Sequence, residues 1–280
     1  MSDRVLISLL GAATFFVAAL IGIIALFLLR ESLGVLSDVG LVRFFTDSAW
    51  LPTLGRYNIL PMVVASVLLM AGAVMIAAPV AVLIAVFLRF YAHLTLAAVG
   101  HRILEVLAGL PSVVYGLWGL VVVVPIIAAW QQPGASLITG ILVLAVMVFP
   151  TAAIVIDSAL KSLPPEILEV SEALALSRAY RIRAVVLPSI RASIATGIIL
   201  AAARAVGETM AVMMVTGNIV AIPGDMFEPV RALTANIALE MGYALGNHRG
   251  ALYVSSLLLM IVVVLLVAIN ALFTSNRRFA

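Results

Sequence analysis

Several residue types are scarce or missing in this chain of 280 residues, and each absence excludes a class of function. The chain has no cysteine, so it can form neither a disulfide nor a thiolate metal site. Charged residues make up only 10% of it, against about 25% in an ordinary soluble domain. Lysine occurs once, at Lys161, with no glycine-rich loop before it. A phosphate-cradling Walker sequence is therefore absent, and the chain cannot hydrolyse ATP in that way by itself.

Apolar residues fill the space that charges leave, because 65% of the chain is hydrophobic. A helix needs roughly 20 apolar residues to cross a bilayer. Long apolar runs predict an all-α membrane protein with six transmembrane helices, forming a single domain over residues 1–280. The first run is too long for the apolar core of a signal peptide, so we expect a retained helix. The runs are Val5–Leu29, Ile59–Leu88, Ile103–Ala129, Leu137–Ala159, Ile190–Val215 and Ala251–Phe273.

The arginine and lysine pattern sets the expected orientation, because cytoplasmic segments carry an excess of both. We expect both termini in the cytoplasm, an inner loop at about 160–189 and outer loops at about 30–58 and 216–250. The basic pI of about 9.6 reflects these dispersed residues, which favour membrane topology over a surface for nucleic acid. Ten basic residues then lie inside: Arg4, Arg89, Arg102, Lys161, Arg178, Arg181, Arg183, Arg191, Arg277 and Arg278. Five lie outside: Arg30, Arg43, Arg56, Arg231 and Arg249.

The inner loop is the most charged part of the chain and reads KSLPPEILEVSEALALSRAYRIRAVVLPSIR. Pro164 and Pro165 suit the first turn of a helix, and Glu166 and Glu169 favour its N-terminus. Apolar residues between these glutamates and the arginines that follow predict one or two short amphipathic helices outside the bilayer. The residues alone favour two interpretations equally. One is a helix resting on lipid headgroups, and the other is a helix that docks in the groove of a cytosolic partner.

The spacing of this loop resembles the signature of ABC importer permeases, which is Glu-Ala-Ala, a glycine six positions after the Glu, and then Ile-x-Leu-Pro. An alternative register that starts at Glu172-Ala173 places Leu-Pro three residues too early. The preferred register departs from the signature at its third position and at the glycine, where alanine adopts a positive φ less readily. Its residues are Glu169, Val170, Ser171, Ala175, Leu187 and Pro188.

Further segments are similar to the PstC family, the permeases of bacterial phosphate importers. They cover most of residues 44–254. The permeases for sulfate, molybdate and phosphonate share the architecture and are the nearest alternatives. The matching segments are WLPTLGRYNILPMVVAS, EVLAGLPSVVYGLWGL from Glu105, LAVMVFPTA from Leu144, RAVGETMAVMMVTGN from Arg204 and NIALE…GNHRGALY from Asn236.

This resemblance implies a type I ABC importer permease in the bacterial inner membrane, without catalytic activity or a cofactor of its own. A second permease like PstA would complete the channel, and a dimeric ATPase like PstB would supply ATP-Mg chemistry beneath it. A periplasmic binding protein like PstS would deliver phosphate. The short inner-loop helix would then be the coupling helix, seated in a groove of the ATPase.

Two charges lie deep in the fifth apolar run, at Arg204 and Glu208. A charge at the bilayer centre costs about 2.5–3.5 kcal/mol on insertion scales. Their i,i+4 spacing predicts that both lie on one face of a continuous helix, where they partly neutralise each other. One interpretation is an ion pair that fixes helix packing. The other is an anion pathway, in which the guanidinium fork of Arg204 meets phosphate, Glu208 moderates it and the Thr209 hydroxyl lies nearby.

Two other functional classes compete with a permease. A channel or secondary transporter acting alone predicts inverted repeats or several intramembrane carboxylates, and neither pattern is evident. An intramembrane enzyme needs a nucleophile with a base, or metal ligands, and no histidine lies in the middle of a run.

Overall fold

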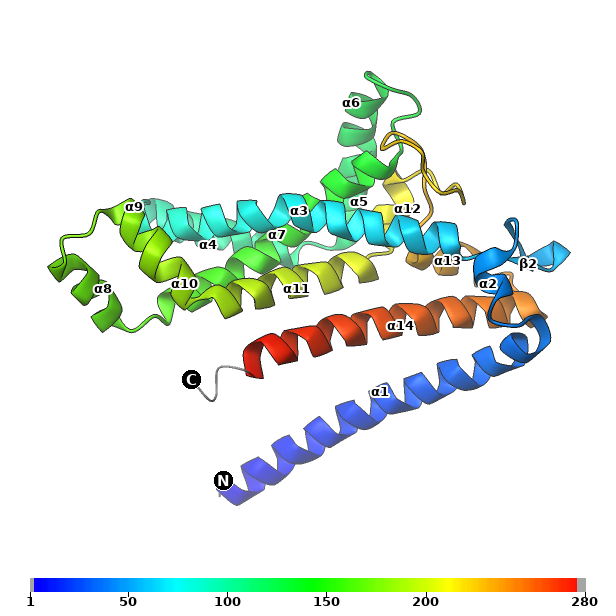
Figure 1. The fold of residues 1–280 in the computed structure, drawn as a ribbon, viewed down its shortest axis with the longest axis horizontal. Coiled ribbons are helices and arrows are strands. Elements are labelled where there is room, and N and C mark those ends of the chain that lie inside the picture. Colours follow the sequence, from blue (N-terminus) through cyan, green and yellow to red (C-terminus); the bar gives the residue numbers. More distant parts are fainter. Residues whose placement is uncertain (1–2, 276–280) are drawn as a thin grey trace. The chain divides into compact units, whose positions relative to one another are not determined.

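The computed structural model describes residues 3–275, with side chains described for residues 5–271. The chain forms two compact units, whose elements are labelled in Figure 1. One unit consists of Met1–Leu60 and Asn236–Val262, and the other of Pro61–Ala235 and Val263–Ala280. Arg277 and Arg278, which the orientation argument counts as cytoplasmic, lie outside the described residues.

Membrane-spanning helices dominate both units. Four helices in the described part of the chain are long and apolar enough to cross a membrane, and two bent helix pairs raise the number to as many as six. The predicted all-α, six-span architecture is therefore confirmed. The four are Val5–Val39, Leu60–Phe90, Leu137–Lys161 and Gly246–Ala271, and the pairs are Leu94–Gly109 with Ser112–Ala128 and Arg178–Ser189 with Arg191–Gly207.

The first unit extends its helices beyond the apolar runs. Helix α1 (Asp3–Val39) continues past Leu29, and α14 (Gly246–Ser275) starts before its apolar run. Val35 is buried against Gly250, where an added Cβ would lie 3.0 Å from the Cβ of Val35. This packing stabilises helical turns that the hydrophobic run alone does not predict. The loops expected at 30–58 and 216–250 are consequently shorter than predicted.

A small hairpin follows α1 in the same unit. Its two strands pair antiparallel, with Trp50 opposite Tyr57. Both side chains are buried, and their rings meet edge to face with centroids 6.3 Å apart. The elements are α2 (Arg43–Thr46), β1 (Trp50–Leu51), the 3₁₀ turn η1 (Pro52–Leu54) and β2 (Arg56–Tyr57).

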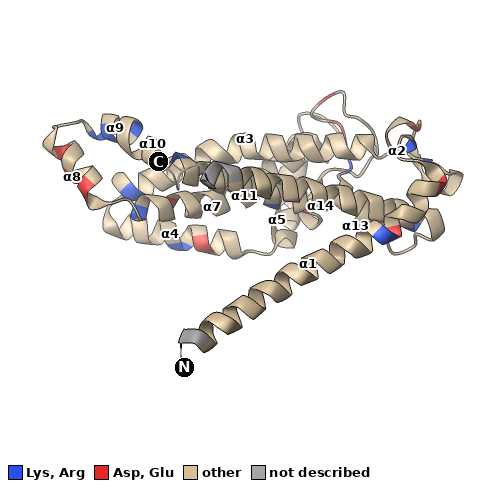
Figure 2. Ribbon diagram, turned by 60° about the horizontal axis from the view of Figure 1, so that its bottom comes forward, with Lys and Arg blue, Asp and Glu red and all other residues tan. Residues whose placement is uncertain are grey.

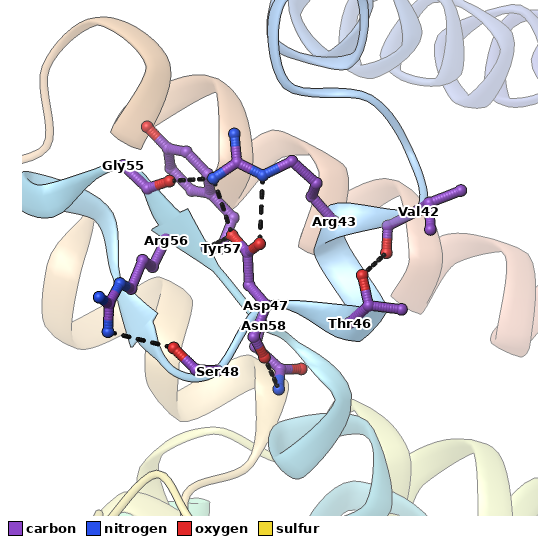
Figure 3. A network of polar contacts seen from close by, with 9 residues as sticks. All are labelled: Val42, Arg43, Thr46, Asp47, Ser48, Gly55, Arg56, Tyr57 and Asn58. Carbon is purple, nitrogen blue, oxygen red and sulfur yellow. Dashed lines mark hydrogen bonds and ion pairs between the residues drawn. The ribbon is translucent and has the colours of Figure 1, made fainter.

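Asp47 ties α2 to this hairpin (Figure 3). Its carboxylate accepts hydrogen bonds from Nε and Nη2 of Arg43 at 3.1 and 3.2 Å, and from the Tyr57 backbone N–H at 2.9 Å. The hydrogen bonds from Arg43, followed by that from Tyr57, hold the pKa of Asp47 below its ordinary value. A depressed carboxyl pKa stabilises the fold above the pKa of the unfolded chain, and this contribution is lost as pH falls through the folded pKa.

A buried cluster joins the hairpin to the last part of the unit. The Trp50 indole Nε1–H donates to Oε2 of Glu240 at 2.9 Å, and Nε2 of His248 lies 2.8 Å from the same oxygen. Glu240 ends α13 (Leu233–Glu240), and His248 lies in the first turn of α14. These bonds satisfy a buried carboxylate, which would otherwise carry a large desolvation cost.

The second unit packs four long helices around an apolar core, with α3 and α11 alongside α7 in Figure 1. The core-facing side of α7 supplies fully buried residues such as Val143 and Ile156. Gly197 lets α11 approach α7 closely, because an added Cβ would lie 3.1 Å from the carbonyl oxygen of Ala152. The helices are α3 (Leu60–Phe90), α4 (Leu94–Gly109), α7 (Leu137–Lys161) and α11 (Arg191–Gly207).

The third apolar run, which the sequence predicts as one transmembrane helix, is sharply bent in the structure. Helix α4 ends at Gly109, and the chain turns by 95° into α5 (Ser112–Trp118), the π-helical turn η2 (Gly119–Val123) and α6 (Val124–Ala128). Pro111 explains the break, because it lacks an N–H and disfavours a helical conformation in the residue before it. Leu110 is accordingly extended, with ψ 137°. We call this site the first break.

The segment around residues 160–189, which the sequence predicts as an inner loop and which we call the inner segment, forms the expected short helices. Proline residues begin α8 (Pro165–Ala173), with Pro164 as its N-cap. Figure 2 shows acidic residues on α8 and basic residues on α9. The chain then bends by 70° at the start of α11. The remaining elements are α9 (Arg178–Arg181), the π-helical turn η3 (Ile182–Val186) and α10 (Leu187–Ser189).

Candidate functional site

The fifth apolar run is interrupted at the two charges that the sequence singles out. Helix α11 ends at Gly207, Glu208 is extended with ψ 127°, and α12 (Met210–Val215) starts two residues later. The prediction of one continuous helix with Arg204 and Glu208 on a single face is therefore wrong. We call this site the second break.

Glu208 explains why the helix stops. Its Oε1 accepts a hydrogen bond from the Ala211 backbone N–H at 3.1 Å, and so satisfies a donor at the start of α12. The Glu208 carbonyl oxygen accepts from the Thr234 hydroxyl at 2.8 Å. A negative charge at a helix N-terminus is also favoured by the helix dipole. The carboxylate therefore stabilises a new helix start rather than pairing with the preceding turn.

Arg204 bonds to other helices instead. Its Nη1 donates to the Thr151 hydroxyl of α7 at 2.9 Å. Nη1 and Nη2 also face the Ala108 carbonyl oxygen in the last turn of α4, at 3.4 and 3.5 Å. These two contacts are long, so they are weak hydrogen bonds. Among the ion pairs of the described residues, none joins Arg204 to Glu208.

The two charges therefore stabilise opposite ends of two different helices. The cation Arg204 lies at the C-terminal carbonyls of α4, and the anion Glu208 lies at the N-terminal amides of α12. Each arrangement agrees with the sign of the helix dipole. Helix ends at membrane depth need such partners, because lipid offers no hydrogen bonds to a free backbone group.

Thr209 lies at the N-cap position of α12. Its hydroxyl is 3.4 Å from the Gly207 carbonyl oxygen, and no side-chain hydrogen bond caps the helix from this residue. Glu208 provides the cap instead. Thr209 thus lies beside the break and remains a predicted pathway residue.

The helices that follow the two breaks, α5 and α12, pack together. Gly116 of α5 lies directly against α12, where an added Cβ would be 2.9 Å from the Ala211 Cα. A hydrogen bond also crosses the first break, because the Tyr115 hydroxyl of α5 donates to the Leu107 carbonyl oxygen of α4 at 2.7 Å. Arg204 and the two breaks therefore form one region of the second unit.

The signature residues of the inner segment surround a sharp turn at Ala175. This alanine has a positive φ of 50°, the left-handed conformation for which glycine is better suited. Its N–H donates to the Glu172 carbonyl oxygen at 2.8 Å, and the Leu176 N–H donates to that of Ser171 at 3.3 Å. The bend expected where the signature has glycine is present despite the alanine.

Polar contacts hold the turn in place. The Glu172 carboxylate pairs with Arg181, and the buried Ser171 hydroxyl donates to the Leu168 carbonyl oxygen at 2.7 Å. The Arg178 guanidinium lies 5.5 Å from the centre of the Tyr91 ring, between α3 and α4. This cation–π contact fixes α9 against the ends of the spans.

The exposed face of α8 carries apolar side chains that make no such contacts. Val170 on this short helix and Leu174 at its C-cap are exposed by 60% and 67%, beside the exposed Glu169. Leu187 and Pro188 lie in α10, at the bend into α11. An apolar patch beside acidic residues is therefore available on the segment that carries the signature.

Two contacts between helices do not follow from the sequence pattern. Asp157 pairs with its i,i+4 neighbour Lys161 at 2.7 Å, and it also lies 2.9 Å from His101, which links α4 to α7. Thr151 contacts Arg204 from a different helix. The FPTA segment contains Thr151, but its position relative to Arg204 depends on how α7 packs on α11. No local pattern in the sequence reveals it.

Comparison with known proteins agrees with this architecture. Residues 77–279 match the family described as "Binding-protein-dependent transport system inner membrane component". The chain belongs to this family. Its members are membrane proteins, and the expected permease fold is thereby confirmed for this chain.

Individual relatives point in the same direction. The chain is 34% identical over 250 residues to the probable ABC transporter permease protein YqgH of Bacillus subtilis, in a match that covers 87% of this chain and 81% of the relative. It is 30% identical over 291 residues to the phosphate transport system permease protein PstC of Mesorhizobium japonicum, with 96% and 89% covered. The predicted resemblance to PstC permeases is confirmed.

A solved structure supports the family fold. The chain superposes on the MetNI methionine ABC transporter in an inward-facing conformation with a TM-score of 0.57 and 19% sequence identity. The match covers 78% of this chain and 94% of that one. At this identity, the likeness establishes the fold of a permease of this family and nothing about the transported molecule.

Proposed function

We propose that this permease is a subunit of an ATP-driven phosphate importer, in which it forms half of the translocation pathway. The observation that carries the proposal is a partly satisfied arginine where two broken membrane helices meet, in a chain similar to PstC permeases. Irregular backbone and helix ends at membrane depth are typical of transporter binding sites. The two compact units work together as one permease domain over residues 1–280.

Arg204 is the residue that meets the anion. A guanidinium presents a planar fork of N–H donors that suits a phosphate oxygen pair. Its contacts with Ala108 are long, so an arriving anion can replace them at low cost. Glu208 and Thr209 belong to the pathway by shaping the second break, and the negative charge of Glu208 limits how tightly the region holds an anion.

The inner segment couples this permease to a cytosolic ATPase. The exposed apolar residues of α8 suit a helix-in-groove contact, with Val170 and Leu174 as its anchors. Glu169, Ser171, Glu172 and Ala175 shape that helix and its turn, while Leu187 and Pro188 transmit its movement into α11. The excess of basic residues at this end supports a cytoplasmic location for it and for both termini.

The complex then contains partners that supply what this chain lacks. They are a second permease like PstA, an ATPase dimer like PstB with ATP and Mg²⁺, and a periplasmic binding protein like PstS. No cofactor is assigned to this chain, and it acts as a non-catalytic subunit. An importer of another oxyanion, such as sulfate, molybdate or phosphonate, is the second candidate, because a guanidinium attracts those ions as well.

Uptake by the reconstituted complex tests the proposal. We expect phosphate uptake into proteoliposomes only when the ATPase and ATP are present. Uptake by this chain alone, independent of ATP, would assign it to channels or secondary transporters. Competition by excess sulfate or molybdate decides the anion, since an importer of either would take it up in preference to phosphate.

The Arg204→Gln variant tests the pathway. A hydrogen bond to a charged group contributes about 1.5–3 kcal/mol, so uptake should fall by roughly 10- to 100-fold. Arg102→Gln is the matched control, because Arg102 is an exposed arginine on α4. The variant complex should assemble normally, as measured by size-exclusion chromatography. Normal uptake by an assembled Arg204→Gln complex would exclude a pathway role.

A further inference from the structure

The hydroxyl of Thr151 does not donate back to its own helix. Many others donate back to the carbonyl oxygen four residues earlier, as those of Ser158, Thr216 and Ser255 do. Thr151 accepts a hydrogen bond from Arg204, and within the described residues its own O–H has no acceptor. A half-buried hydroxyl with an unused proton is therefore held beside a guanidinium.

Arg204 leaves donors unused at the same place. Its strongest contact is the bond of 2.9 Å to Thr151, and the two contacts with Ala108 are long. Because a guanidinium carries five N–H donors, several remain for another acceptor. The bond to Thr151 orients the guanidinium and brings the two sets of donors to one point between α7 and α11.

We propose that Thr151 is a direct ligand of the transported oxyanion, and that its O–H donates to one anion oxygen while Arg204 donates to others. The inference rests on the proposed function, because it places the ligand in the pathway that Arg204 defines. The anion would thus be bound by a positively charged donor from α11 and a neutral donor from α7. A change in the packing of these helices separates the two donors and weakens the site, which allows the anion to leave.

The position of Thr151 suits this role. It follows Pro150, which has no N–H and therefore leaves the helix ladder of α7 incomplete at that turn. Ala152 and Ala153, the next residues, are buried in the core, so the backbone at Thr151 is held firmly. A site ligand on a rigid helix keeps its geometry better than one on a loop.

Two substitutions separate the hydroxyl from the shape of the side chain. Thr151→Val keeps the shape and removes the donor, whereas Thr151→Ser keeps the donor. We expect Thr151→Val to lower the rate of phosphate uptake by the full complex about tenfold or more, and Thr151→Ser to stay within about twofold of the parent. Unchanged uptake in the Thr151→Val complex would overturn the proposal.

Labelling of a cysteine decides whether Thr151 touches the anion or only supports Arg204. The parent chain contains no cysteine, so Thr151→Cys provides its only thiol. Modification of this chain by a small anionic thiol reagent is followed by mass spectrometry, with and without inorganic phosphate. We expect phosphate to slow the reaction of the introduced thiol at least about threefold, because a bound anion repels and blocks the reagent.

Ser158→Cys is the matched control, because it lies exposed on the same helix and its labelling should not depend on phosphate. A thiol at position 151 that phosphate does not protect, or that no reagent reaches, would overturn direct contact. Arg204→Gln in the same uptake assay keeps the two proposals distinguishable. If Arg204→Gln abolishes uptake while Thr151→Val leaves it normal, only the role of Thr151 fails.

Discussion

The first and second breaks interrupt two membrane helices of one unit, yet they are stabilised by different means. The first contains Pro111, whose ring and missing N–H prevent a regular helix locally. The second contains no proline. It depends on the carboxylate of Glu208 at the start of α12 and on the Thr234 hydroxyl at the Glu208 carbonyl. A break imposed by the backbone should survive the loss of a side-chain contact, whereas a break made by side chains should not.

Of the substitutions that test this comparison, removal of the Glu208 carboxylate should reduce phosphate uptake the most. The loss of a helix cap costs about 0.5–2 kcal/mol, so Glu208→Ala should lower phosphate uptake about 3- to 30-fold. Glu208→Gln keeps an oxygen acceptor for the Ala211 N–H and should lose only about two- to fivefold through the weaker dipole interaction. Initial uptake rates in proteoliposomes measure both. Equal losses in the two variants would mean that the charge acts beyond capping.

The bend at the first break should persist when its proline is replaced. Pro111→Ala restores a backbone N–H, but the Tyr115 hydroxyl and the packing of Gly116 still favour the bend. We expect a loss of uptake of about fivefold or less, in keeping with one hydrogen bond of about 1 kcal/mol deciding between forms.

The conformation of this variant can be measured directly. Spin labels at exposed positions Leu96 and Val121 flank the first break, and their separation should be little changed in Pro111→Ala. Adding Tyr115→Phe should lengthen it as the segment straightens. A straightened segment in Pro111→Ala alone would show that proline is the sole cause of the bend.

A substitution at the Ala175 turn should have the smallest effect, and it is the only one of these changes that should raise the stability of the fold. Here neither a proline nor a capping side chain accounts for the positive φ. Ala175→Gly removes a left-handed strain of about 1–2 kcal/mol but adds about 0.4–1 kcal/mol of unfolded-chain entropy. The net gain should be under about 1 kcal/mol, seen as a slightly higher unfolding temperature of the purified chain. Ala175→Val is the control and should lower it, because a branched side chain tolerates this φ poorly.

The sequence predicts those parts of the fold that depend on local composition. Long apolar runs determine the spans, and the prolines with the following glutamates determine where α8 begins. Pro111 also lies in the predicted third run, but a proline within a membrane helix is compatible with either a kink or a sharp turn. The angle of 95° depends on the packing of α5 against α12, which no local pattern encodes.

The residues of the candidate site can be predicted from the sequence, but their geometry cannot. Arg204 and Glu208 stand out because each charge is costly in lipid. Their spacing favours a pair on one face, but Glu208 gains more from the α12 amide and from a backbone position held by Thr234. Thr234 and Thr151 are distant in sequence from both charges. Ala108 contributes only a carbonyl oxygen, and a backbone contact of this kind has no signature in side-chain pattern.

The hydrogen bond from Trp50 to Glu240 joins residues separated by 190 positions. A ribosome adds about 5–20 residues per second, so the partner of Trp50 is synthesised roughly 10–40 s after Trp50 itself. The Trp50 indole therefore lacks its Glu240 acceptor until the chain has been synthesised as far as Glu240. The buried polar cluster of this unit can therefore form only after translation has passed Glu240 and His248, so it is one of the last parts of the fold to be completed.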